Sequence, residues 1–173
     1  MGEYMFKLIV FIFIAFSHES FSKNFEVLMK NKGSNGEKMV FEPALVKVSP
    51  GDTINFVATS SGHQVQSFKK GVPEKCSIKT KKGKKEKAVD CSKGDKKNIL
   101  KSGSIKKGAT YSVTISDEGY YAIMCKPHMT MGMVGLIVVG SPKNSDAFKK
   151  KLFTNKKLKK KSLARMKKIL GNI

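Results

Sequence analysis

The chain has 173 residues, enough for one domain with a well-formed core. Its formal net charge is +21, with 34 basic and 13 acidic residues, which favours acidic partners or surfaces. The lysines lack the interleaved aromatic and arginine residues of sequence-specific readers, so specific nucleic-acid recognition is not expected. The sequence shows neither a nucleotide-binding loop nor a pair of carboxylates in a recognisable pocket, so an enzyme is not expected.

Residues 1–22 have the pattern of an export signal. Lys7 is basic, residues 8–16 are apolar, and Ser20, Phe21 and Ser22 precede a cut near Lys23. A retained membrane anchor is the alternative, but this apolar run is much shorter than the roughly 20 residues that span a bilayer. We therefore predict an exported, soluble mature protein.

Short runs with strand-like alternation follow the signal, separated by turn residues rich in glycine, proline, asparagine and serine. About seven short strands with function-bearing loops predict a β-sandwich. The expected strands are residues 25–30, 39–48 (broken by Pro43), 53–58, 65–68, 111–115, 119–124 and 134–139.

Residues 69–107 interrupt this pattern with 15 lysines against 4 acidic residues, a net charge of +11. Because the segment shows little hydrophobic periodicity, we expect an exposed and partly mobile insert. It could enlarge a docking surface, bind an anionic surface, or merely decorate the protein.

Three cysteines in an exported chain give one disulfide and one thiol left over. Cys76 and Cys91 share the insert, whereas Cys125 lies close to His128. We therefore predict a Cys76–Cys91 disulfide and a free Cys125. Two reduced thiols, or a zinc site that uses all three cysteines, are the alternatives.

Beyond residue 140 the hydrophobic period becomes helical. Asn144 or Ser145 can cap a first helix and Ser162 a second, which carries Met166 and Ile169 on one side. Residues 143–173 hold 12 basic residues against one acid, again +11, so the rest of the mature chain is neutral. We favour an amphipathic pair that covers one sheet over a membrane-surface or nucleic-acid segment.

The residues with the clearest chemistry are Cys125, His128 and Met133, with His63 far upstream. One thiolate, two imidazoles and one weakly bound thioether form the ligand set of a blue-copper electron-transfer site. Met129 and Met131 leave open a copper(I) chaperone or storage site, but we expect them to be apolar loop residues.

The chain resembles the pseudoazurins, a family within the cupredoxins. The resemblance implies a Greek-key sandwich, one type 1 copper bound by His63, Cys125, His128 and Met133, and a soluble periplasmic carrier that feeds reductases such as those of denitrification. Gln64 departs from the usual asparagine, and the long insert has no counterpart. The matching stretches are residues 25–27, 39–44, 50–53, 62–63, 119–120, 125, 127–128, 131–135 and the C-terminal helices.

The sequence therefore predicts a mainly β protein: a signal at 1–22, a cupredoxin domain at 23–140 with its insert at about 69–107, and a helical extension at 141–173 packed on the domain. The expected function is single-electron transfer by a monomeric periplasmic copper protein to a redox partner with an acidic docking surface. Delivery of copper itself to another periplasmic protein is the alternative.

Overall fold

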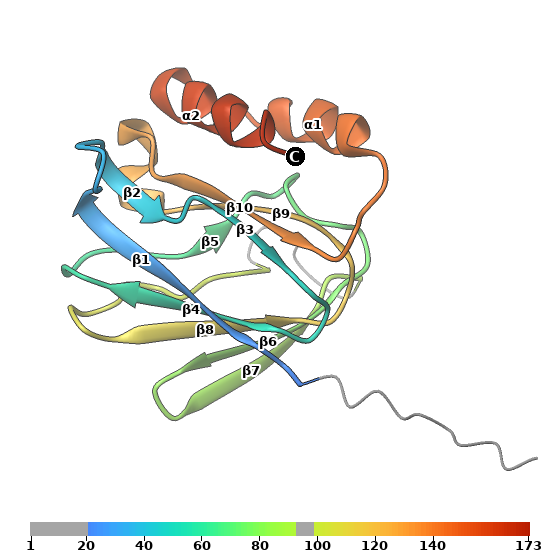
Figure 1. Ribbon diagram of the computed structural model, residues 1–173, viewed down its shortest axis with the longest axis horizontal. Coiled ribbons are helices and arrows are strands. Elements are labelled where there is room, and N and C mark those ends of the chain that lie inside the picture. The colour runs from blue at the N-terminus through green and yellow to red at the C-terminus, as the bar shows by residue number, and fades with distance from the viewer. Residues whose placement is uncertain (1–20, 93–98) are drawn as a thin grey trace, which may run out of the picture.

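Two β-sheets and a pair of C-terminal helices make up the computed structural model, which describes residues 21–92 and 99–173 (Figure 1). The predicted export signal lies outside these residues, except for its last two positions. In the described part of the chain, no helix is long and apolar enough to cross a membrane.

The first sheet has six strands in the order β2-β1-β4-β8-β6-β7. β1 pairs parallel with β4, and every other neighbour in this sheet is antiparallel. Its strands are β2 (Lys38–Glu42), β1 (Asn24–Lys32), β4 (Thr53–Ala58), β8 (Thr110–Ile115), β6 (Ser77–Lys82) and β7 (Lys85–Asp90).

The second sheet has four strands in the order β3-β10-β9-β5, with β3 parallel to β10. Pro43 divides the second extended run, and its two halves, β2 and β3, join different sheets. The predicted β-sandwich is therefore confirmed. The strands are β3 (Leu45–Val48), β10 (Val134–Val139), β9 (Gly119–Met124) and β5 (Gln66–Ser67).

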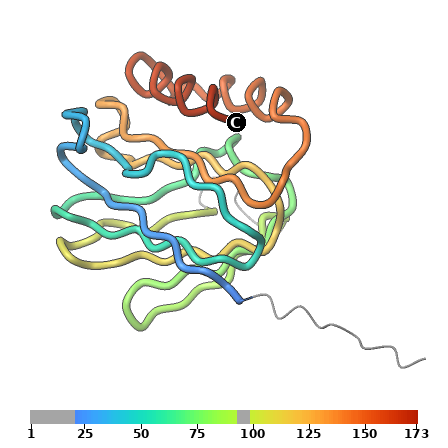
Figure 2. The backbone as a smooth tube through the Cα atoms, viewed as in Figure 1, coloured from blue at the N-terminus to red at the C-terminus, as the bar shows by residue number. Residues whose placement is uncertain are grey.

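All six residues of β10 are buried because both faces of its sheet are covered. Ile137 and Val139 belong to the core between the two sheets, whereas Leu136 and Val138 face a second core beneath the helices. Side chains alternate along a strand, so one apolar run supplies both cores. Figure 2 shows the two helices lying across the outside of this sheet.

Helices α1 (Ser145–Phe153) and α2 (Lys160–Leu170) bury Leu152, Met166 and Ile169 in the second core. The predicted amphipathic pair is thus confirmed. Asn144, one of the two predicted candidates, occupies the N-cap position of α1, but its side chain makes no capping hydrogen bond there.

Ser162 was predicted to cap the second helix, and this was wrong. α2 begins at Lys160, so Ser162 lies inside its first turn. There the Ser162 hydroxyl accepts a hydrogen bond from the Lys159 backbone N–H at 3.1 Å and donates one to the Lys159 carbonyl at 2.8 Å. A serine at this position satisfies the cap residue from within the helix, which its sequence position alone does not distinguish from a cap.

The described part of the insert, residues 69–92 and 99–107, is also more ordered than predicted. β6 and β7 form an antiparallel hairpin that extends the first sheet, and Ile99, Leu100 and Ile105 are buried after it. The strand period was hidden because β6 sends only Ile78 and Thr80 inward, between exposed lysines. A short strand with two inward positions gives almost no hydrophobic signal.

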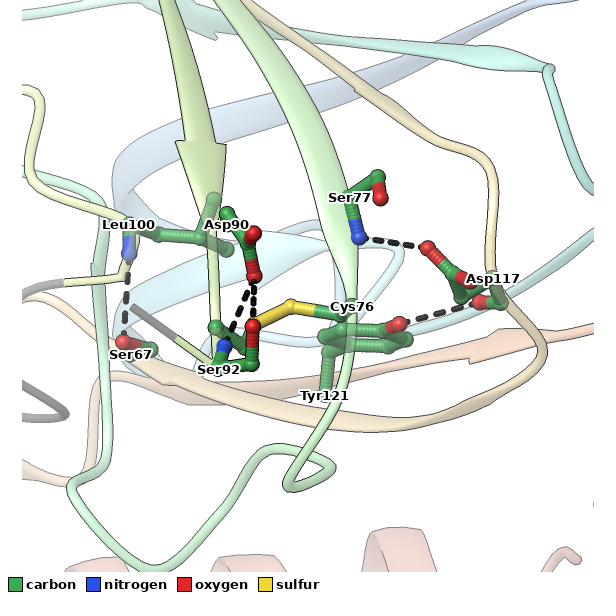
Figure 3. The surroundings of a disulfide bond; sticks show 9 residues. Ser67, Cys76, Ser77, Asp90, Ser92, Leu100, Asp117 and Tyr121 are labelled. Carbon is green, nitrogen blue, oxygen red and sulfur yellow. Dashed lines mark hydrogen bonds between the residues drawn. A yellow bond between two sulfur atoms is a disulfide. The ribbon is translucent and has the colours of Figure 1, made fainter. Parts of the chain in front are cut away.

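The predicted Cys76–Cys91 disulfide is present, with its Cα atoms 4.9 Å apart, and it closes the base of the hairpin (Figure 3). The Ser77 N–H donates to the Asp117 carboxylate, which ties the start of β6 to the β8–β9 turn (Figure 3). Since the two insert cysteines are joined, a zinc site that uses all three cysteines and a fully reduced set are both ruled out.

Candidate metal centre

Strand pairing brings Cys125 opposite Met133. β9 and β10 pair Met124 with Val134, and one position further the Cys125 N–H donates to the Met133 carbonyl at 3.0 Å. Both side chains are fully buried in the core between the sheets, which the alternation along β9 and β10 requires. The spacing between these two residues is thus fixed by a β-hairpin.

The 3₁₀ turn η1 (Lys126–Met131) closes this hairpin and carries His128. The His128 N–H donates to the Cys125 carbonyl at 3.1 Å, and the Met133 N–H donates to the His128 carbonyl at 3.2 Å. His128 Nδ1 lies 3.4 Å from Cys125 Sγ, and the ring is only partly buried. The turn therefore fixes the backbone of all three predicted ligands relative to one another.

His63 reaches the same place from the turn after β4, and its side chain is fully buried. Its Nδ1 lies 3.9 Å from Cys125 Sγ, and its ring meets that of His128 edge-on at a centroid distance of 5.1 Å. The donor atoms of His63, Cys125 and His128 all lie within 4.8 Å of one another. Residues far apart in the sequence thus form one compact cluster.

A hydroxyl that sequence reasoning missed orients His63. Ser60 Oγ lies 3.0 Å from His63 Nε2, the ring nitrogen that points away from Cys125. A partner on the outer nitrogen of a ligand histidine fixes the ring orientation. The serine three residues before a candidate ligand was a signal that could have identified it.

The electrostatics of the cluster favour a neutral imidazole at His63. Burial lowers the pKa of His63, and repulsion from His128 lowers it further. Burial raises the pKa of the Cys125 thiol, while hydrogen bonds from the backbone N–H groups of Gln64 and His128 act in the opposite direction. A buried thiol with such donors around it is stabilised as a thiolate by a nearby cation, which is what a bound metal supplies.

Gln64 makes the cross-loop link through its backbone. Its N–H donates to Cys125 Sγ at 3.3 Å, so this tie between the two predicted ligand loops does not depend on the side chain at position 64. The departure from asparagine therefore leaves the thiolate contact in place.

The end of the insert supports the His63 loop, a role the sequence did not reveal. Ser102 exchanges hydrogen bonds with Val65, whose N–H donates to the Ser102 hydroxyl at 2.9 Å, and the Ile105 N–H donates to the His63 carbonyl at 2.9 Å. Lys82 of the hairpin donates to the carbonyls of Ser102 and Ser104 at 2.9 and 2.6 Å. The insert is therefore built into the support of the cluster rather than being decoration alone.

The donor set fits copper. A thiol and two imidazoles converge in a site that excludes water at Cys125 and His63, and buried Met133 lies beside Cys125 on the same face. Soft sulfur with imidazole selects copper over the hard cations magnesium and calcium. Met131 is 39% exposed, and partly buried Met129 packs toward the second core. Neither Met129 nor Met131 therefore shares the buried position of Met133 between the two sheets.

Comparison with known proteins agrees with this chemistry. The family model for copper-binding proteins of the plastocyanin/azurin family matches residues 27–140. The pseudoazurin of Paracoccus pantotrophus is 37% identical over 137 residues, which cover 79% of this chain and 77% of the relative.

Solved structures give the same result. A pseudoazurin from Sinorhizobium meliloti superposes with a TM-score of 0.61 at 35% identity, over 87% of this chain and 95% of that one. The pseudoazurin of Hyphomicrobium denitrificans gives 0.60 at 29% identity, over 87% and 98%. With a matching fold and sequence, this chain belongs to the plastocyanin/azurin family of copper-binding proteins, as a pseudoazurin-like blue copper electron carrier and not an enzyme.

Proposed function

We propose that His63, Cys125, His128 and Met133 hold one type 1 copper, and that the protein passes single electrons to an acidic redox partner in the periplasm. The observation that carries this proposal is the convergence of one thiol and two imidazole nitrogens within 4.8 Å, beside a buried methionine. Copper bound there would supply a one-electron couple between its two common oxidation states.

The chain contributes a site that changes little when the charge on the metal changes. Cys125 is held by backbone hydrogen bonds to Met133 and from Gln64, and His63 is held by Ser60 and Ile105. Fixed ligands reduce the reorganisation that accompanies electron transfer, because the site already has the geometry that both oxidation states must share.

His128 provides the route to the surface. It is partly exposed, whereas His63 is fully buried, and its neighbours Pro127 and Met131 are exposed on the same turn. Apolar side chains around a ligand imidazole form a small patch on which a partner can settle close to the metal. We therefore place the docking face at η1.

A basic hollow beside this face supports an acidic partner. A cavity of about 490 Å³ is lined by polar residues, by Met124, the residue before Cys125, and by five lysines. Among the described residues that line it there is no acid. A concave surface with one sign of charge concentrates field lines and raises association rates. The lysines of this basic hollow are Lys69, Lys70, Lys126, Lys156 and Lys157.

The proposed periplasmic location is supported by the N-terminal sequence and by the disulfide. Residues 1–22 have the pattern of an export signal, and the Cys76–Cys91 disulfide suits an oxidising compartment. Cell fractionation with N-terminal sequencing of the recovered protein tests this. A periplasmic protein that begins near Lys23 is the expected result, and a cytoplasmic full-length chain would contradict it.

The visible spectrum of the copper-loaded protein tests the proposed centre. The oxidised wild type should be intensely blue, and Cys125→Ser should lose the thiolate-to-copper charge-transfer band while keeping its fold. Met133→Leu should shift the spectrum, because leucine fills similar volume without a sulfur. Met131→Leu is the matched control on the exposed side of the same turn and should leave the spectrum unchanged.

Copper delivery, the alternative function, predicts that the protein releases its copper readily to a chelator. An electron carrier should keep its copper through repeated oxidation and reduction in the presence of a copper(I) chelator. Rapid loss of copper to the chelator in the reduced state would favour delivery. A Cys125→Ser protein that stayed blue would remove the proposed centre altogether.

A further inference from the structure

A single arginine of the C-terminal helix contacts the loop that carries Met133. Arg165 lies in the middle of α2, and its side chain is 16% exposed. Its Nη1 donates to the Gly132 carbonyl at 2.7 Å and to the Met39 carbonyl at 2.8 Å. The same guanidinium contacts the Lys38 carbonyl at 3.4 Å and forms an ion pair with Glu37 at 3.5 Å. One side chain thus joins three parts of the fold.

The Gly132 carbonyl belongs to the peptide bond that leads into Met133. The other side of this peptide is also fixed, because the Met133 N–H donates to the His128 carbonyl at 3.2 Å. A peptide group held at both its oxygen and its nitrogen has a fixed plane, and this plane sets the direction of the following side chain. Arg165 therefore acts on the orientation of Met133 without touching it.

The fit between Arg165 and Gly132 is close. Gly132 has a φ of +96°, and a Cβ there would lie 3.2 Å from the Arg165 guanidinium carbon. Glycine is favoured by the backbone conformation, and it also lets the guanidinium approach the loop. The end of the turn is thus shaped to receive this side chain from α2.

We infer that Arg165 is a positioning residue for the Met133 thioether, through the hydrogen bonds that its Nη1 donates to the Gly132 and Met39 carbonyls. This rests on the proposed ligand role of Met133. A weak axial thioether tunes the reduction potential, so its position matters to the function. A lysine at this position ends in one nitrogen on a shorter side chain, so it cannot keep the Nη1 hydrogen bonds to the Gly132 and Met39 carbonyls together with the Nη2 contacts to the Lys38 carbonyl and Glu37.

The test compares Arg165→Ala and Arg165→Lys with Lys168→Ala, which removes a charge from the exposed side of the same helix. In the copper-loaded proteins, both Arg165 variants should change the ratio of the two main absorption bands and the reduction potential. Lys168→Ala should leave the band ratio unchanged, and its potential shift measures the effect of charge alone. If Arg165→Ala fails to fold, Arg165→Lys decides the question.

A second readout needs no metal. In the metal-free protein, the Met133 amide should exchange its hydrogen on the order of tenfold faster in the Arg165 variants, since a charge-assisted hydrogen bond that fixes this peptide is lost. Unchanged band ratio and unchanged Met133 exchange in Arg165→Lys would overturn the inference. So would a lower melting temperature with neither change.

A failure of this inference can be distinguished from a failure of the proposed copper centre. A wild type that is not blue, or a Met133→Leu variant with an unaltered spectrum, would refute the ligand assignment. The exchange rate at Met133 would still report whether Arg165 holds this peptide.

Discussion

The two lysine-rich segments of this chain carry the same net charge but are built into the molecule differently. Residues 69–107 and residues 143–173 each sum to +11. Helices α1 and α2 bury apolar residues against the outside of a sheet, whereas hairpin β6–β7 lies at the edge of the other sheet with five of the six residues of β7 exposed (Figure 1). Net charge alone does not indicate which segment serves the metal centre.

The difference extends to the centre. Both segments line the basic hollow, with Lys69 and Lys70 from the start of the insert and Lys156 and Lys157 from the helical segment, but only the helical segment contacts the Met133 loop, through Arg165. The hairpin contacts the centre only indirectly, because Lys82 donates hydrogen bonds to the loop that supports His63. We infer that the helices belong to the proposed docking face and that the hairpin is mainly an extension of the scaffold.

The largest expected effect is on stability. Met166 is fully buried in the core beneath the helices, so Met166→Ala should lower the free energy of unfolding by about 2–5 kcal/mol. The matched truncation in the hairpin, Val89→Ala at a half-buried position, should cost about 1 kcal/mol or less. Denaturant unfolding of both variants measures the contrast, and equal losses would show that the two segments are equally integral.

The disulfide gives the second effect. Replacing both Cys76 and Cys91 with serine removes a bridge with a sequence separation of 15, which should cost about 3 kcal/mol in the chain-entropy model. Because the bridge lies at the base of the hairpin, the copper spectrum should stay unchanged in the folded variant. A lost or shifted blue band would contradict a peripheral hairpin and would place it closer to the centre than the contacts indicate.

The sequence predicted most of what alternation and spacing determine. Cys125 and Met133 lie opposite each other because the strands around them pair in simple register, and this pairing is encoded in two clean apolar runs. The two histidines could be proposed as ligands because few residue types bind copper. The disulfide followed from the separation of Cys125 from the other two cysteines along the chain.

Contacts that depend on backbone acceptors could not be predicted in this way. Arg165 donates to carbonyls 33 and 126 residues away, at Gly132 and Met39, and a carbonyl carries no mark in the sequence. The hairpin escaped prediction because lysines at outward positions outnumber its inward apolar residues. Tertiary neighbours decide both features, and local patterns do not record them.

The smallest expected effect separates the basic hollow from the hairpin by rate. Lys69, Lys126, Lys156 and Lys157 line the basic hollow, two of them on the helical segment, whereas Lys79, Lys84, Lys85 and Lys87 are exposed on the hairpin. Changing each set to glutamine removes the same charge. Oxidation of the reduced protein by the anion hexacyanoferrate(III) should slow on the order of tenfold for the first set at low salt, and much less for the second. This follows because Lys126 is two residues from His128, where the electron is proposed to leave.

The cation tris(phenanthroline)cobalt(III) should react faster with the first set, since repulsion between the oxidant and the lysines is relieved. Both differences should shrink as salt shortens the screening length, which is about 10 Å at 0.1 M. Equal slowing by the two sets would show that the whole field of the protein steers the encounter, and would remove the basic hollow from the docking face.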